Sequence, residues 1–205
     1  MSEKKQTCNL TAQGWINKNR KPFLFANLLI FLGIWFFTNP LWLLSYHTLD
    51  IMEGLGSLFL IAGVLGRIYS SLTIASHKNK EIVKTEIYSV VRHPLYFFSF
   101  FIAVGIGLLT GRPELLLYIT SFYLICFYPM ILNEERYLID KFGKEYTDYK
   151  KQVPMLIPNF SKWKAREKME INVRLVTKTL LDGSLYLLII PMIEIVDFIK
   201  YLILG

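Results

Sequence analysis

The chain has 205 residues, of which 53% are hydrophobic and 15% aromatic, with a formal net charge of +7 and a mean hydropathy of +0.38. Its apolar residues occur in long blocks, which is typical of membrane proteins and argues against an ordinary soluble domain. The two cysteines, Cys8 and Cys126, lie far apart, so neither a disulfide framework nor a metal site is expected. The polar N-terminus lacks the features of a signal peptide, so we expect the first apolar block to stay in the mature protein.

Five apolar blocks are each near the roughly 20 residues that a helix needs to cross a bilayer. The predicted spans are residues 23–46, 51–75, 95–111, 115–132 and 184–204. Of the 23 Lys and Arg residues, 20 fall in segments that alternating spans place on one side of the membrane: 1–22, 76–94 and 133–183. This asymmetry predicts a cytosolic N-terminus, and it favours contact with lipid headgroups over binding to nucleic acid.

The first two spans carry distinct helix signals. Pro40 predicts a bend or break near Asn39 in the first span. The second span contains small residues that permit close helix contact: Gly54, Gly56, Gly63 and Gly66. Arg67, near the inner end of this span, either extends to the headgroups or has a function, and the sequence leaves both open.

The third and fourth spans form a tight hairpin around "TGRPE" at 110–114. The helix of the fourth span is predicted to continue past Asn133, to end at a C-cap formed by Gly143, and to be followed by a second short helix. A basic, Trp-bearing stretch at 159–174 suits the membrane surface. We expect the final block to span the membrane, with a placement at the interface as the alternative.

Two groups of polar residues lie at the same depth, because the hairpin is antiparallel. They are Arg92, His93 and Tyr96 at the start of the third span, and Asn133, Glu134 and Glu135 at the end of the fourth. Each residue alone has a plain structural explanation, such as contact with a headgroup or a favourable place at a helix end. Two opposed clusters on one hairpin favour a binding site instead.

The motifs "TEIYSVVRHPLY" and "NEERYLIDKFGKEYTDYKKQVPMLIP" resemble those of the isoprenylcysteine carboxyl methyltransferase family and the related phospholipid methyltransferases. The resemblance covers roughly 67–158 and suggests three regions. Residues 1–66 hold an N-terminal cytosolic segment and the first two spans, 67–158 hold the methyltransferase-like core, and 159–205 hold a basic amphipathic segment and the C-terminal helix.

The resemblance implies an all-α polytopic membrane enzyme, with about five transmembrane helices and a cytosol-facing pocket for S-adenosyl-L-methionine. The acceptor would be lipophilic, either an isoprenylcysteine-type carboxylate or a phospholipid amine. The catalytic residues carried over are Arg92, His93 and Glu134. The residues carried over for cofactor binding are Lys80, Glu81, Ile82, Val83, Tyr88, His93, Pro94, Leu95, Tyr96, Glu134 and Glu135. No metal is expected.

Two departures from the family pattern bear on function. Glu86 stands where a glycine is expected in a turn that needs a positive φ, and Met130 stands where members acting on prenylcysteine have an arginine. These departures leave open a non-catalytic membrane binding protein. A second alternative is a membrane reductase of the sterol-reductase type using NADPH, whose C-terminal region is distantly similar. The sequence does not distinguish a bacterial or archaeal inner membrane from the endoplasmic reticulum, and it does not predict the oligomeric state.

Overall fold

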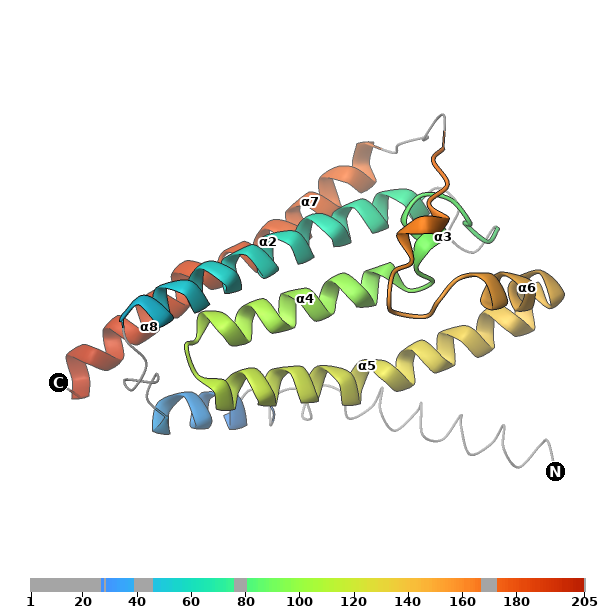
Figure 1. Cartoon of the computed structure of the whole chain (residues 1–205). Helices are drawn as coiled ribbons and strands as arrows, with labels where there is room; N and C mark the ends of the chain where they lie inside the picture. Colours follow the sequence, from blue (N-terminus) through green and yellow to red (C-terminus); the bar gives the residue numbers. More distant parts are fainter. Residues whose placement is uncertain (1–26, 28, 39–45, 76–80, 167–172, 205) are drawn as a thin grey trace, which may run out of the picture. The chain divides into compact units, whose positions relative to one another are not determined.

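The computed structural model of the protein describes residues 27, 29–38, 46–75, 81–166 and 173–204 (Figure 1). Within these ranges the regular structure is entirely helical, as predicted. The chain divides into two compact units, Met1–Asn39 and Pro40–Gly205. In the first unit, residues 29–37 are helical, whereas the bend predicted at Pro40 lies outside the described residues.

The second unit contains seven described α-helices and one short 3₁₀-helix. They are α2 Tyr46–Ala75, α3 Ile87–Val90, α4 Pro94–Leu109, α5 Pro113–Phe142, α6 Lys144–Gln152, η1 Phe160–Lys162, α7 Val173–Leu187 and α8 Ile189–Leu204. Three described stretches are long and apolar enough to cross a membrane, namely Asp50–Ile74, Pro113–Phe142 and Thr179–Val196. Helix α4 is apolar but shorter.

The last apolar block belongs to helices that begin earlier than the predicted residue 184. Helix α7 starts at Val173, and only Leu188 separates it from α8. This interruption has a local cause, because Pro191 has no N–H to donate to the carbonyl of Leu187. Figure 1 shows α7 (orange-red) running beside α2 (teal), and α8 continuing from α7.

Helix α2 packs closely against α4 because glycines face the contact. A Cβ atom on Gly63 would lie 2.8 Å from the carbonyl oxygen of Phe98, and one on Gly105 would lie 2.7 Å from the backbone nitrogen of Leu60. Gly54, in contrast, has open space around it. The predicted contact role is confirmed for three of the four glycines: Gly56, Gly63 and Gly66.

The hairpin and the helix that continues from it form as predicted. Gly111 adopts a φ of 60° in the turn between α4 and α5, and Pro113 opens α5. Helix α5 is 30 residues long and continues beyond its apolar part. Its C-cap is Gly143, which has a φ of 56° and donates its N–H to the carbonyl of Ile139. The short helix α6 then begins at Lys144.

Residues 153–166 return across α3 and fix the loop that leads into α4. The backbone N–H of Arg92 donates to the carbonyl of Pro154 at 2.9 Å, and the N–H of Asn159 donates to the carbonyl of Val90 at 2.9 Å. Underneath, the Tyr149 hydroxyl donates to the carbonyl of Tyr88 at 2.6 Å. The α3 region is thus held by segments from later in the chain, so its conformation depends on the whole unit.

Candidate functional site

One buried carboxylate at the point where α4 begins is surrounded by three basic side chains. Glu135, 2% exposed, accepts Nη2 of Arg92 at 3.0 Å and Nζ of Lys150 at 2.6 Å. Nε2 of His93 lies 3.3 Å from the same carboxylate. These contacts join the α3–α4 loop to α5 and α6. We call Arg92, His93, Glu134, Glu135 and Lys150 the polar cluster.

The neighbouring acid, Glu134, has a different environment. Its side chain is 44% exposed, against 3% for Glu135, and its Oε2 lies 3.9 Å from Nδ1 of His93. Tyr96 also hydrogen-bonds to Glu134. The pairing of an Arg-His motif with a Glu-Glu motif, predicted from the hairpin alone, is therefore present, but only Glu134 offers an accessible carboxylate.

The protonation of His93 follows from its surroundings. Burial lowers the pKa of His93 below its ordinary value, although Glu134 and Glu135 act in the opposite direction. The imidazole is therefore neutral at neutral pH. We assign its proton to Nε2, because Glu135 accepts there, and this leaves the lone pair of Nδ1 facing Glu134. Two hydrogen-bond acceptors then stand side by side, an arrangement that suits a ligand carrying several N–H donors.

Two buried polar atoms beside this pair have no hydrogen-bond partner among the described residues: Nε of Arg92 and the hydroxyl of Tyr146. Tyr146 is 2% exposed and interacts electrostatically with Glu134, Glu135 and Arg92. Buried polar groups are normally satisfied, so these two unpartnered atoms mark the polar cluster as a candidate binding site. Neither Tyr146 nor Lys150 was predicted as a site residue, although both belong to the quoted motif that contains Glu135.

The other predicted site residues lie close by or below the polar cluster. Tyr88 is a buried residue of α3, Pro94 opens α4, and Leu95 is half-buried in the first turn of α4. Glu81 is exposed. Ile82 packs against the apolar cluster that contains Tyr146 and Tyr149, and Val83 belongs to the cluster that contains Tyr88. Lys80 lies outside the described residues. The cofactor-binding role of these side chains stays a prediction.

Glu86 occupies the turn where a glycine was expected, and the turn does have a positive φ. Its φ of 55° is the only positive value at a described non-glycine residue, and such a conformation costs about 1–3 kcal/mol. Hydrogen bonds offset this strain. The Glu86 carboxylate accepts the Tyr69 hydroxyl and the backbone N–H of Arg166, and the Glu86 N–H donates to the carbonyl of Lys164. Glu86 thus ties α2 and the returning segment to the site.

Comparisons with known proteins found similarity to methyltransferases and to metal-resistance proteins. Residues 51–145 match the family model described as phospholipid methyltransferase. The chain is 27% identical to the nickel-cobalt-cadmium resistance protein NccN of Alcaligenes xylosoxydans xylosoxydans, over 72% of this chain and 70% of that protein. No solved structure matches the chain.

Two named methyltransferases share shorter regions. The chain is 37% identical to the protein-S-isoprenylcysteine O-methyltransferase of Schizosaccharomyces pombe, over 45% of this chain and 40% of that protein. It is 41% identical to methanethiol S-methyltransferase 1 of Bradyrhizobium diazoefficiens, over 35% of this chain and 24% of that protein. The chain therefore spans less than half the length of either enzyme.

Proposed function

We propose that the protein is a methyltransferase of the phospholipid methyltransferase family, whose model matches residues 51–145, and that it transfers a methyl group from S-adenosyl-L-methionine to a lipophilic acceptor. The observation that carries the proposal is the half-exposed Glu134 beside the neutral His93. The apolar helices and the relatives support an integral membrane protein.

The polar cluster fits the amino-acid end of this methyl donor. The Glu134 carboxylate and Nδ1 of His93 are adjacent acceptors that an ammonium group can bridge. The free Nε–H of Arg92 can donate to a carboxylate, and the Tyr146 hydroxyl can donate or accept. Glu135 has a supporting role, because its oxygens are already bound by Arg92, His93 and Lys150.

The chemistry requires orientation and exclusion of water more than a reactive side chain. When bound, S-adenosylmethionine would supply a methyl group on a sulfonium: the lone pair of the acceptor would form the new bond to carbon as the carbon–sulfur bond breaks, leaving S-adenosylhomocysteine. Tyr96 contributes to the orientation through its hydrogen bond to Glu134 and its edge contact with the His93 ring at 5.9 Å. The returning segment 153–166 covers α3 and shields the back of the site from water.

The acceptor would enter from the bilayer, since the helices around the site expose apolar side chains. Leu124, Ile125 and Tyr128 on α5 are each at least half exposed, as is Met130. An isoprenylcysteine-type carboxylate or a phospholipid amine meets this requirement. We further propose five spans with the N-terminus in the cytosol, which places the Lys-rich helix α6 and the polar cluster on the cytosolic side.

The direct test is methyl transfer from S-adenosylmethionine carrying a radiolabelled methyl group, using membranes that contain the full chain. We expect label in the lipid-extractable fraction, and we expect Glu134→Ala to reduce it at least tenfold. Asp140→Ala, at another exposed acid of α5, is the matched control and should transfer normally. Absence of lipid-extractable label with the wild type would refute the proposal.

A further inference from the structure

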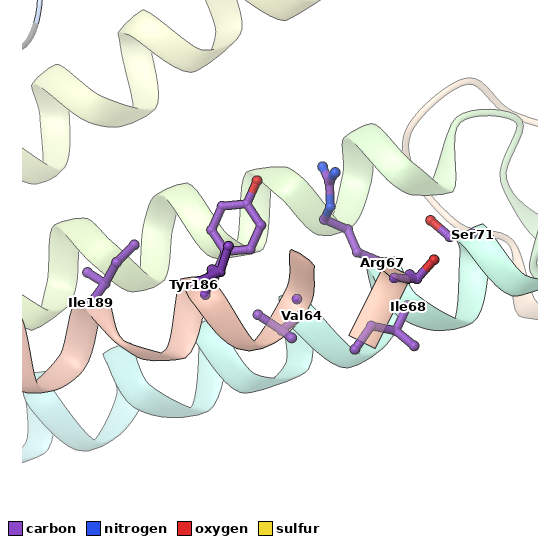
Figure 2. A pocket seen from close by; sticks show the side chains of 9 residues that line it. Val64, Arg67, Ile68, Ser71, Tyr186 and Ile189 are labelled. Atoms are coloured by element: carbon purple, nitrogen blue, oxygen red, sulfur yellow. The ribbon is translucent and has the colours of Figure 1, made fainter. Parts of the chain in front are cut away.

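A hollow lies between α2 and the α7–α8 pair, lined by none of the residues of the polar cluster. It has a volume of about 540 Å³, within the range of small-molecule sites. Its lining combines aliphatic side chains with a few polar ones, as Figure 2 shows. The lining residues used below are Val64, Arg67, Ile68, Ser71, Tyr186 and Ile189. We call this hollow the α2–α7 cavity.

Arg67 is the charged group of this cavity, and its described partners are neutral. It lies within the apolar stretch Asp50–Ile74, where a cation costs roughly 2.5–3.5 kcal/mol on insertion scales. It donates to the hydroxyl of Ser99 and lies 5.8 Å from the ring centre of Tyr186. Among the described residues, no carboxylate lies within ion-pair distance of it.

The shape and chemistry of the cavity match an amphipathic anion. Arg67 supplies a forked donor suited to a carboxylate or a phosphate, and Ser71 adds a hydroxyl. The remaining walls, such as Val64, Ile68 and Ile189, are aliphatic and suit an apolar body. A purely apolar ligand would leave the guanidinium without a counter-charge, and a cationic ligand would be repelled.

The cavity is connected to the polar cluster through Arg67 itself. Figure 2 shows the Arg67 and Tyr186 side chains extending from α2 and α7 toward α4. Arg67 interacts electrostatically with Tyr96 on α4 and with Tyr123 on α5, whose hydroxyl donates to the carbonyl of Tyr96 at 2.7 Å. Tyr96 in turn contacts Glu134. A head group bound at Arg67 would therefore lie near the site proposed for methyl transfer.

We propose that Arg67 binds the anionic group of the acceptor, a carboxylate or phosphate ester whose apolar body occupies the α2–α7 cavity. The inference deepens the proposed function and rests on it for the identification of the ligand as the acceptor. It specifies that the acceptor, or the part of it held here, is negatively charged and amphipathic.

A structural role for Arg67 is the competing explanation, since its bond to Ser99 links α2 to α4. Two variants separate the roles. Ser99→Ala removes the link and keeps the cation, whereas Arg67→Gln removes the cation and keeps a group able to hydrogen-bond to Ser99. Arg67→Lys serves as a second variant because it preserves the charge while losing the forked donor.

The experiment is photocrosslinking of the full chain in a neutral maltoside detergent, with a dodecanoate probe carrying a diazirine in its chain. We expect label in the peptides that contain residues 64–71 and 179–189. The amount of label in these peptides should fall at least tenfold in Arg67→Gln and several-fold in Arg67→Lys, and it should be unchanged in Ser99→Ala. Equal labelling of the wild type and both Arg67 variants would overturn the inference.

Competition identifies the head group. Unlabelled dodecanoate and dodecyl phosphate should displace the probe, while dodecyltrimethylammonium should not. The anion that displaces it at the lower concentration is the preferred head group. If dodecyltrimethylammonium displaced the probe as effectively as the two anions, the inference would be overturned. Cavity labelling without methyl transfer by the wild type would refute only the proposed function, and methyl transfer without cavity labelling would refute only this inference.

Discussion

The polar cluster and the α2–α7 cavity differ in how they accommodate charge away from water. In the cluster, Glu135 is bound by three basic side chains, so the protein supplies its own counter-charges. In the cavity, Arg67 has a hydroxyl and an aromatic ring as its described partners. The first arrangement holds helices together and presents Glu134 outward, while the second leaves a charge for a ligand to neutralise.

The largest expected effect comes from removing the centre of the cluster. Glu135→Ala would remove the carboxylate that pairs with the buried Arg92 and the half-exposed Lys150, and breaking such a buried pair typically costs about 3–5 kcal/mol. Glu134→Ala should change stability by less than about 0.5 kcal/mol, because that side chain is half exposed. Denaturant unfolding in mixed micelles measures both. Similar losses in the two variants would contradict the division of roles between the two glutamates.

The contact between α2 and α4 links the two regions, and its close packing can be tested separately. Gly105→Val would force atoms into the backbone of α2 near Leu60 and should destabilise the protein by about 1–3 kcal/mol. Gly54→Ala is the matched control in open space, expected to be neutral or stabilising by up to about 1 kcal/mol. Thermal unfolding of both variants in one detergent gives the comparison, and equal stabilities would mean that α2 and α4 do not pack this way.

A smaller effect is expected from pH at the cluster. Since the folded pKa of His93 is lowered, below about pH 6.5 the unfolded chain binds a proton at this residue that the folded chain does not. Stability should therefore fall as the pH drops from about 6.5 toward the folded pKa, by at most about 1.4 kcal/mol per pH unit, and should not change on this account at higher pH. The difference between wild type and His93→Gln isolates the effect. A difference that does not vary with pH would contradict a buried, neutral His93.

Much of the fold and the centre of the site could be predicted from local signals. The hairpin at Gly111 and the C-cap at Gly143 are short-range features that determine chain direction, and direction alone brings His93 close to Glu135. Lys150 and Tyr146 were not predicted as site residues, because the placement of α6 depends on the backbone of Gly143 and on packing against α5. The hydropathy of the sequence contains no information on either.

The start of α7 was also missed, for a different reason. The part of α7 before residue 184 contains Thr177, Lys178 and Asp182, so the apolar block becomes visible only later in the sequence. Helix α7 nevertheless extends along α2, where Gly183 approaches the side chain of Ile68. The α2–α7 cavity was invisible to sequence reasoning for the same reason, because it depends on two helices far apart in the chain.

The central claim is that the polar cluster binds S-adenosylmethionine through Glu134, and equilibrium binding to the detergent-solubilised full chain tests it most directly. We predict that the wild type binds S-adenosylmethionine and not NADPH, and that Glu134→Ala and His93→Ala each weaken binding at least tenfold, or about 1.4 kcal/mol. The control Asp140→Ala should bind as the wild type does. Unchanged affinity in both site variants, or binding of NADPH instead, would contradict the account.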